Sequence, residues 1–205
     1  MAALLLLPGA AHAGLNDSVA AAQSGDYLGA VKALAVSLEE TLTTAIDTAA
    51  PKVERGLGTI EALIGDAYYY GHGVSRDYGE AVRMYRKAAA KSNATAQSTL
   101  GDIYFYGRGA PQDFVEAVKW WTLAAEANIA TAQLNLSVML ANGDGTPQDY
   151  VSAHMYANLA ASQLPPGEDR DTAIKNRDIV AKLMSREQLA EAQRLALEWR
   201  AKQSN

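Results

Sequence analysis

The stretch YYYGHGVSRDY, at residues 68–78, decides the fold because it recurs along the chain. The sequence reads YFYGRGAPQDF at residues 104–114 and LANGDGTPQDY at residues 140–150, so the stretch returns every 36 residues. Each copy holds two glycines followed by an aspartate. These residues are Gly71, Gly73 and Asp77, then Gly107, Gly109 and Asp113, then Gly143, Gly145 and Asp149. A fixed period of this length is typical of a helical repeat protein.

The residue between the paired glycines changes from His72 to Arg108 to Asp144. A metal or phosphate site would not accept an imidazole, a cation and an anion in turn, so we expect a conformational role for the glycines. A glycine after a helix adopts the left-handed conformation without a Cβ penalty. Each aspartate is predicted to cap the next helix, with Glu80 and Glu116 completing capping boxes.

Each period therefore predicts a helix, a glycine turn and a second helix. A single helix pair cannot bury its apolar face, so the repeats are expected to stack. The predicted fold class is all-α, a right-handed α/α superhelix (solenoid) with a 36-residue period. The predicted parts are an N-terminal helical half-repeat with an insertion (14–58), repeats at 59–94, 95–130 and 131–163, and a C-terminal helical cap (164–205).

Both ends of the repeat array carry further signals. Pro51, Gly56 and Gly58 are expected to end a helix before the first full repeat opens, which makes residues 39–58 an insertion. This insertion is expected to form either a few extra helical turns or a lid or docking arm. In the cap, residues 170–184 are predicted to be helical, with Ile179 and Leu183 on the same side as the other apolar residues. Ser185 and Gln188 predict a capping box for a last helix.

The repeats resemble the Sel-one-like repeat (SLR), a relative of the tetratricopeptide repeat with a longer turn. Residues 97–125 carry the family's pattern almost completely, and residues 61–89 nearly as well. The matching residues of the second copy are Leu100, Gly101, Tyr104, Gly107, Gly109, Asp113, Ala117, Trp121, Ala124 and Ala125. The third copy departs from the pattern at Ser137, Leu140 and Ala157. The resemblance implies a tetratricopeptide-like helical solenoid, in a family that includes adaptors, regulators and a few enzymes.

Composition excludes several functions. The chain of 205 residues has a formal net charge of −5 and no run of like charges, whereas nucleic acids and anionic lipids need clustered cations. Cysteine is absent, which excludes disulfides and zinc–thiolate sites. After the first 13 residues only His72 and His154 remain, at unrelated repeat positions. We therefore expect no metal site and no cofactor.

The N-terminus indicates export. Residues 2–7 are apolar, and Ala11-His12-Ala13 fits a cleavage site that would make residues 1–13 a signal peptide. The segment is short and lacks a basic n-region, for which an upstream start would account; the alternative is an unprocessed apolar helix. The apolar run is too short to span a membrane. The expected location is periplasmic or secreted.

The predicted function is a non-catalytic interaction scaffold in the bacterial cell envelope. Stacked first helices would present a concave groove that binds a peptide or protein partner. The predicted groove residues are Asp66, Tyr69, Thr99, Asp102, Phe105, Asn135 and Met139. The groove lacks the Lys/Arg set that clamps a C-terminal carboxylate, and its composition suits a polar or weakly cationic ligand.

An enzymatic alternative rests on one acidic pair. Asp66 and Asp102 occupy equivalent positions on adjacent first helices, and two carboxylates could act as acid and base in a hydrolase of envelope polysaccharide or peptidoglycan. The competing interpretation is that both aspartates simply lie on solvent-exposed faces of their helices, where acidic residues usually occur. No common motif of exported hydrolases, such as Gly-x-Ser-x-Gly or His-Glu-x-x-His, occurs in the sequence.

Overall fold

The computed structural model describes residues 21, 26, 28–33, 36 and 50–203, with side chains from Arg55 onward in the last range. The expected signal peptide (1–13) and most of the N-terminal half-repeat, including residues 39–49 of the insertion, lie outside the described residues.

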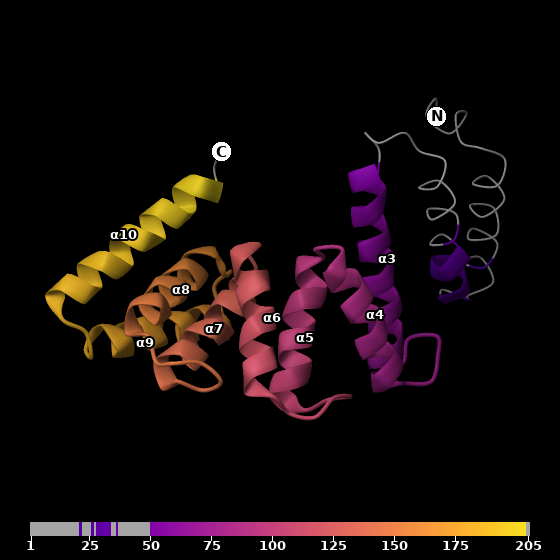
Figure 1. The fold of residues 1–205 in the computed structure, drawn as a ribbon, viewed down its shortest axis with the longest axis horizontal. Coiled ribbons are helices and arrows are strands. Elements are labelled where there is room, and N and C mark those ends of the chain that lie inside the picture. The colour runs from indigo at the N-terminus through magenta and orange to yellow at the C-terminus, as the bar shows by residue number, and fades with distance from the viewer. Residues whose placement is uncertain (1–20, 22–25, 27, 34–35, 37–49, 204–205) are drawn as a thin grey trace. The chain divides into compact units, whose positions relative to one another are not determined.

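The described residues form helices and turns. The labelled helices are α3 (Ala50–Tyr70), α4 (Tyr78–Ala90), α5 (Ala94–Tyr106), α6 (Phe114–Glu126), α7 (Ala130–Asn142), α8 (Tyr150–Gln163), α9 (Glu168–Ala181) and α10 (Arg186–Gln203) (Figure 1). Residues 28–33 are also helical. The predicted fold class, an all-α solenoid of helix-turn-helix repeats with a period of 36 residues, is confirmed.

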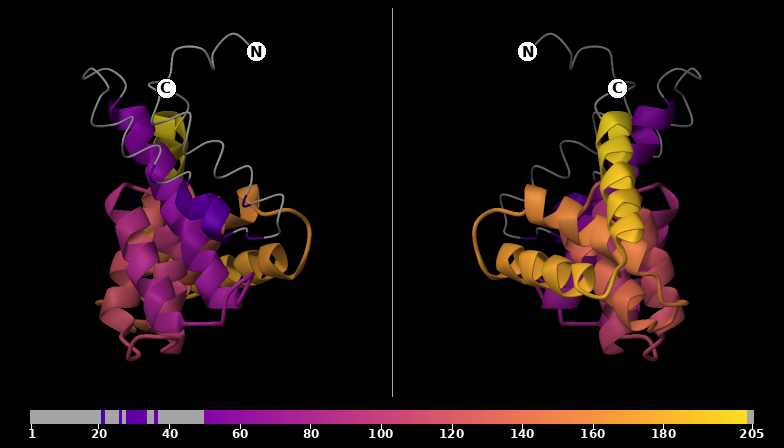
Figure 2. Two further views of the ribbon diagram at one scale, coloured as in Figure 1. Left: turned by 90° about the vertical axis from the view of Figure 1, so that its right-hand side faces the viewer. Right: turned by 90° about the vertical axis from the view of Figure 1, so that its left-hand side faces the viewer.

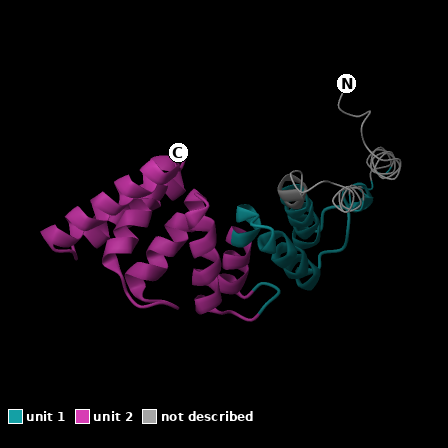
Figure 3. Ribbon diagram, turned by 45° about the horizontal axis from the view of Figure 1, so that its top comes forward, with its two compact units in different colours: residues 1–97, 108–110 teal, residues 98–107, 111–205 magenta. Residues whose placement is uncertain are grey.

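The chain divides into two compact units (Figure 3). Unit 1 comprises residues 1–97 with 108–110, and unit 2 comprises residues 98–107 with 111–205. Helix α5 therefore contributes its first turn to unit 1 and the rest to unit 2. Each unit has a core of its own.

The core of unit 1 joins α3, α4 and the helical segment 28–33. Leu28, Ile60, Ile64 and Met84 are buried together there. The ring of Tyr85, on α4, is 1% exposed and lies over α3 at Gly65, where a Cβ atom would come 2.8 Å from the ring. A glycine at this place on α3 therefore allows the two helices of the pair to approach closely.

Unit 2 repeats this arrangement and extends it. Trp121, on α6, is 2% exposed, and a Cβ atom on Gly101 would come 2.4 Å from its indole. Farther along, α7, α8 and α9 enclose a second cluster. Its members are Leu134, Ala160, Ala161, Leu164 and Ala173. Helix α10 packs through Ala196 on Met155 and Leu159 of α8.

The glycine turns have the predicted conformation. All six paired glycines have positive φ, between 68° and 84°. A Cβ atom on Gly145 would come 2.4 Å from the carbonyl of Phe114, and one on Gly109 would come 2.6 Å from Tyr78. The second glycine of these two turns is thus needed for close approach to the preceding repeat as well as for its left-handed backbone.

The aspartates cap the helices as predicted, but the capping boxes with Glu80 and Glu116 are wrong. Side chains of Asp77, Asp113 and Asp149 accept hydrogen bonds from backbone N–H groups three residues later, at 3.0–3.1 Å. The N–H group of each aspartate donates at 2.9 Å to the carbonyl nine residues earlier, which closes the turn. Because that N–H group is already bonded, Glu80 and Glu116 pair with Arg83 and Lys119 instead.

The helix break predicted near Pro51, Gly56 and Gly58 is also wrong, since α3 runs without interruption from Ala50 to Tyr70. Gly58 lies against α4: a Cβ atom there would come 3.1 Å from the Cβ of Lys91. Tertiary packing of α3 on α4 outweighs the low helix propensity of glycine. Residues 50–58 of the insertion are therefore part of the first helix of a repeat.

The C-terminal cap retains the period. Ser185 stands 36 residues after Asp149, and its side chain accepts from the N–H of Gln188 at 3.2 Å. Gln188 accepts from the N–H of Ser185 at 2.9 Å, so this capping box is confirmed. Helices α9 and α10 run in different directions from the turn between them (Figure 2). Ile179 and Leu183 are 57% and 58% exposed rather than buried with Val180.

Candidate interaction surfaces on the first helices

A cavity of 200 Å³ in unit 2 brings several predicted groove residues together. Its lining residues are Phe105, Tyr106, Trp121, Asn135, Val138 and Met139. Phe105, Asn135 and Met139 are among the predicted groove residues, whereas Tyr106 and Val138 are not. Tyr106 and Val138 are 58% and 37% exposed, so they present apolar surface to solvent. Their positions in the sequence could have indicated them, because Tyr106 directly follows Phe105 and Val138 lies about one helical turn after Asn135.

Aromatic rings form one wall of this cavity. The ring of Phe105 lies 4.9 Å from that of Tyr106, 5.4 Å from that of Phe114 and 5.3 Å from that of Trp121, between centroids. Contacts of this kind stabilise a rigid arrangement of rings. Phe105 therefore holds the wall in place, and the more exposed Tyr106 is the ring that a partner can reach.

Asp102 lies beside the cavity and is engaged in structural contacts. Its Oδ1 atom accepts hydrogen bonds from Trp121 Nε1 at 3.1 Å and from Asn135 Nδ2 at 3.3 Å. The first bond satisfies a donor on a buried indole, and the second orients the Asn135 carboxamide. A buried donor without an acceptor would lower the stability of the fold, so the Asp102 carboxylate stabilises the structure by accepting from the indole N–H.

A second cavity of 200 Å³ lies between α7 and α9 in the same unit. It is lined by Ser137, Val138, Ala141, Asn142, Asn176, Ile179 and Val180. Val138 lines both cavities, so they adjoin along α7. This cavity was not predicted from the sequence, in which Ile179 is only expected on the same side of its helix as the other apolar residues.

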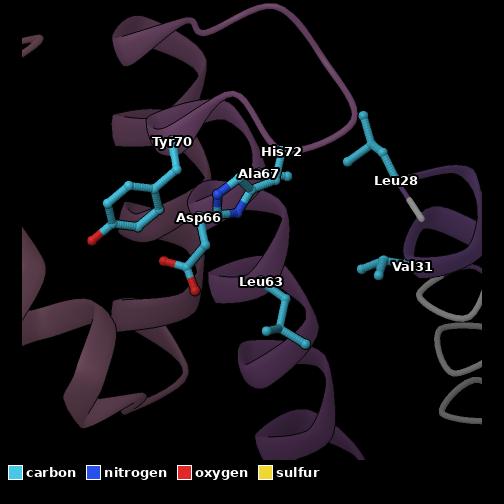
Figure 4. A pocket seen from close by; sticks show the side chains of 7 residues that line it. All are labelled: Leu28, Val31, Leu63, Asp66, Ala67, Tyr70 and His72. Carbon is cyan, nitrogen blue, oxygen red and sulfur yellow. The ribbon is translucent and has the colours of Figure 1, made fainter. Parts of the chain in front are cut away.

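Unit 1 holds a cavity of 340 Å³ between α3 and the helical segment 28–33 (Figure 4). Its lining residues are Leu28, Val31, Leu63, Asp66, Ala67, Tyr70 and His72. Asp66 was predicted and lies here. Asp66 also repeats the arrangement of Asp102, since its Oδ1 atom accepts from the hydroxyl of Tyr85 at 2.7 Å. Burial and this hydrogen bond raise the pKa of Tyr85.

Three predicted groove residues, Tyr69, Thr99 and Asp102, line none of these three cavities. The ring of Tyr69 lies among the rings of Tyr70, Tyr78 and Tyr85, at centroid distances of 4.9–6.2 Å. Its hydroxyl accepts from Arg108 at 3.4 Å. Tyr69 therefore belongs to the packing between α3 and α4. Thr99 is half-buried on α5.

The titratable residues do not gather into a metal site: within residues 21–203, as far as described, no group of three His, Cys, Asp or Glu side chains could hold an ion. His72 stacks on Tyr70, and His154 is buried on α8. Of the helices in the described part of the chain, none is both long and apolar enough to cross a membrane.

The comparisons with known proteins agree with this architecture. A family model described as Sel1 repeat matches residues 60–93, 94–129 and 130–163, about half of the chain. A stretch of 43 residues is 49% identical to the ERAD-associated E3 ubiquitin-protein ligase component HRD3A of Arabidopsis thaliana, and it covers 21% of this chain and 6% of that protein.

Two solved structures are similar over most of the chain. One is a protective antigen present in uropathogenic Escherichia coli strains, displaying an SLR fold, with 26% identity, a TM-score of 0.63 and coverage of 89% of this chain and 39% of the antigen. The other is a Sel1 repeat protein from Oxalobacter formigenes, with 26% identity, a TM-score of 0.60 and coverage of 81% and 58%. The chain thus spans less than two thirds of each of these relatives.

Proposed function

The chain belongs to the Sel1 repeat family, whose repeats generally mediate protein–protein interaction, and on that premise we propose that it is a non-enzymatic scaffold. Its binding surface for a peptide or protein partner is the first-helix face of unit 2. The observation that carries the proposal is the pair of cavities that adjoin at Val138.

The chemistry of this surface suits an extended peptide. Exposed Tyr106, Val138 and Ile179 offer apolar contacts in a row across α5, α7 and α9. Asn135 and Asn142 lie beside them, and a carboxamide can both donate to and accept from a peptide backbone. Pockets for side chains together with polar contacts to the main chain are a common mode of peptide recognition.

The contacts of the two carboxylates at equivalent repeat positions favour a scaffold over the hydrolase alternative. Asp66 and Asp102 each accept a hydrogen bond from the buried aromatic side chain of the same repeat. A general acid or base must reach the substrate proton that it transfers. A structural role explains why this hydrogen bond recurs in two successive repeats, because each repeat has a buried aromatic donor that needs an acceptor. A catalytic role would not explain the recurrence.

The test is partner capture with variants of exposed residues. Tyr69 and Phe105 are poor choices, because their rings pack against Tyr85 and Trp121. We expect wild-type protein to retain a partner from an extract of the source cells and the double variant Tyr106→Ala/Val138→Asp to lose it.

The matched control is Val115→Ala/Leu123→Ala. These residues are 63% and 40% exposed on α6, a second helix of a repeat, and we expect this variant to capture the partner normally. Equal capture by the wild type and both variants would show that the surface is assigned wrongly.

We also propose that the chain acts in the cell envelope after export. Support comes from the apolar residues 2–7 and the Ala11-His12-Ala13 triplet, which fit a signal peptide. N-terminal sequencing of the protein from a periplasmic fraction tests this proposal. We expect Gly14 as the first residue, and a retained Met1 would contradict it.

A further inference from the structure

We propose that the cavity of unit 1 binds a lysine or arginine side chain of the partner, with Asp66 as the counter-ion. The inference rests on the proposed function in that it takes the ligand to be a protein. It adds a second recognition site, in a different unit, and states its chemistry.

The walls of the cavity are apolar and are anchored in the core. Leu28 and Val31 line it from the helical segment 28–33, and Leu63 and Ala67 from α3 (Figure 4). Leu28 is 7% exposed and packs in the cluster that holds Ile60, Ile64 and Met84. Val31 and Ala67 pack against the same cluster, so three of the four apolar wall residues are held by the contacts that fold unit 1, while Leu63 is 49% exposed.

A second contact ties the segment 28–33 to α3. Lys32 donates to the hydroxyl of Tyr68 at 3.4 Å, and its Nζ atom lies 5.7 Å from the centroid of that ring. This cation is directed at Tyr68 and is not among the residues that line the cavity. Asp66 is the one acidic or basic residue, histidine aside, among the seven lining residues.

Only one of the two carboxylate oxygens of Asp66 takes part in its hydrogen bond with Tyr85. Oδ1 accepts from Tyr85, and in the described part of the chain no partner is recorded for Oδ2. The ring of Tyr70 lies at the mouth, 60% exposed and stacked on His72 at 5.5 Å between centroids. Figure 4 shows Asp66 and Tyr70 on the same side of the cavity.

A long cationic side chain matches each of these features. Its methylene stem fits the Leu and Val walls, while its charged head can pair with Oδ2 and face the Tyr70 ring. A purely apolar side chain would leave Oδ2 of Asp66 without a hydrogen-bond partner as it displaced water. An acidic side chain would be repelled, in a chain that already carries a net charge of −5.

The experiment titrates the full ¹⁵N-labelled chain with pentapeptides acetyl-Gly-Ala-Xaa-Ala-Gly-amide, in which Xaa is lysine, arginine, norleucine or glutamate. We expect the lysine and arginine peptides to shift the amide signals of Ala67, Tyr70 and His72. Because a hydrogen bond to a charged group is involved, they should bind about tenfold more tightly than the norleucine peptide.

Two variants make the test specific. Asp66→Asn keeps an acceptor for the Tyr85 hydroxyl, so the fold should persist while the preference for lysine over norleucine disappears. Asp102→Asn changes the equivalent residue of the next repeat and should leave that preference intact. Tyr70→Ala, at an exposed position, should weaken the lysine peptide and leave the circular dichroism spectrum unchanged.

Three results would overturn the inference: equal affinity for the lysine and norleucine peptides, an unchanged preference in Asp66→Asn, or no shift of the unit 1 signals. A peptide that shifts only signals around Tyr106 and Val138 would leave the proposed function standing and refute this site. Loss of partner capture by Tyr106→Ala/Val138→Asp bears on the proposed function alone, so the two failures are distinguishable.

Discussion

At the scale of single residues, side-chain size on one helix is matched to side-chain size on its partner. Gly65 faces the ring of Tyr85, and Gly101 faces the ring of Trp121. In the third repeat the equivalent residues are Ser137 and Ala157, so a larger residue on the first helix accompanies a smaller one on the second. The hydroxyl of Ser137 donates to the carbonyl of Leu134 at 2.6 Å and is therefore satisfied although buried. The departure of this copy from the family pattern is a compensated change.

This matching predicts that the effect of Gly101→Ala on the free energy of unfolding depends on Trp121, and that it changes sign when the indole is removed. In the wild type the new Cβ atom would lie 2.4 Å from a buried, rigid indole. Overpacking costs about 1–3 kcal/mol, which exceeds the gain of about 1 kcal/mol from replacing glycine in a helix. We expect net destabilisation, measured by urea unfolding.

In a Trp121→Ala background the indole is gone and the helix propensity gain remains. Gly101→Ala should then stabilise the protein by up to about 1 kcal/mol. The background variant itself should lose about 3–5 kcal/mol. The same sign in both backgrounds would contradict the proposed matching.

At the scale of elements, the contact of α8 with α9 buries a titratable group. His154, on α8, is 5% exposed, and its Nδ1 atom has no hydrogen-bond partner in the described part of the chain. Burial lowers the pKa of His154, and the charge of Arg177 on α9 lowers it further, while Asp178 opposes the change. Arg177 and Asp178 pair with each other at 2.8 Å.

The lowered pKa predicts that stability falls on acidification. The unfolded chain takes up the proton first, at its ordinary pKa of about 6.5, so folding becomes less favourable as the pH falls below that value. The loss approaches about 1.4 kcal/mol per pH unit and ends below the folded-state pKa. We expect urea midpoints at pH 7, 6 and 5 to show a shallower slope for His154→Leu than for the wild type.

His72→Ala is the control for this pH series, because it removes an exposed imidazole and leaves the buried imidazole of His154 in place. Since the comparison concerns slopes, a packing change in His154→Leu that shifts all three midpoints equally does not affect it. Identical slopes for the wild type and His154→Leu would show that the buried imidazole does not govern the acid sensitivity.

At the scale of the whole molecule, the sequence period was sufficient to predict the fold class. Glycine and aspartate act locally, through backbone conformation and capping, so their spacing could be read without a structure. The course of α3 through Gly56 and Gly58 and the exposure of Ile179 depend on which helices pack together, and no local signal reveals that. The groove was predicted in part for the same reason: Phe105, Asn135 and Met139 follow from the period, but the cavity around Val138 depends on α9.

Helix caps recur every 36 residues, at Asp77, Asp113, Asp149 and Ser185. Since the helix pair α9 and α10 keeps this period, we predict that it completes the stack of unit 2. A chain ending at residue 163 would expose Ala160 and Ala161, which α9 covers, and Met155 and Leu159, which α10 covers. We expect a lower thermal midpoint and self-association in size-exclusion chromatography.

A chain ending at residue 184 retains α9 and is the graded comparison for this truncation. It should uncover only the surface beneath α10 and lose less stability than the shorter chain. A thermal midpoint for the shorter chain equal to that of the full chain would show that α9 and α10 are accessory to the stack.

The hydrogen bond that closes each glycine turn also constrains how such a chain can change in length during evolution. The N–H groups of Asp77, Asp113 and Asp149 all reach back nine residues, to the carbonyls of Tyr68, Tyr104 and Leu140. One residue inserted into or deleted from a turn would separate this donor from its acceptor and displace the cap of the next helix. Duplication or loss of a complete 36-residue unit preserves every closure. We therefore expect relatives to differ in the number of their repeats far more often than in the length of these turns.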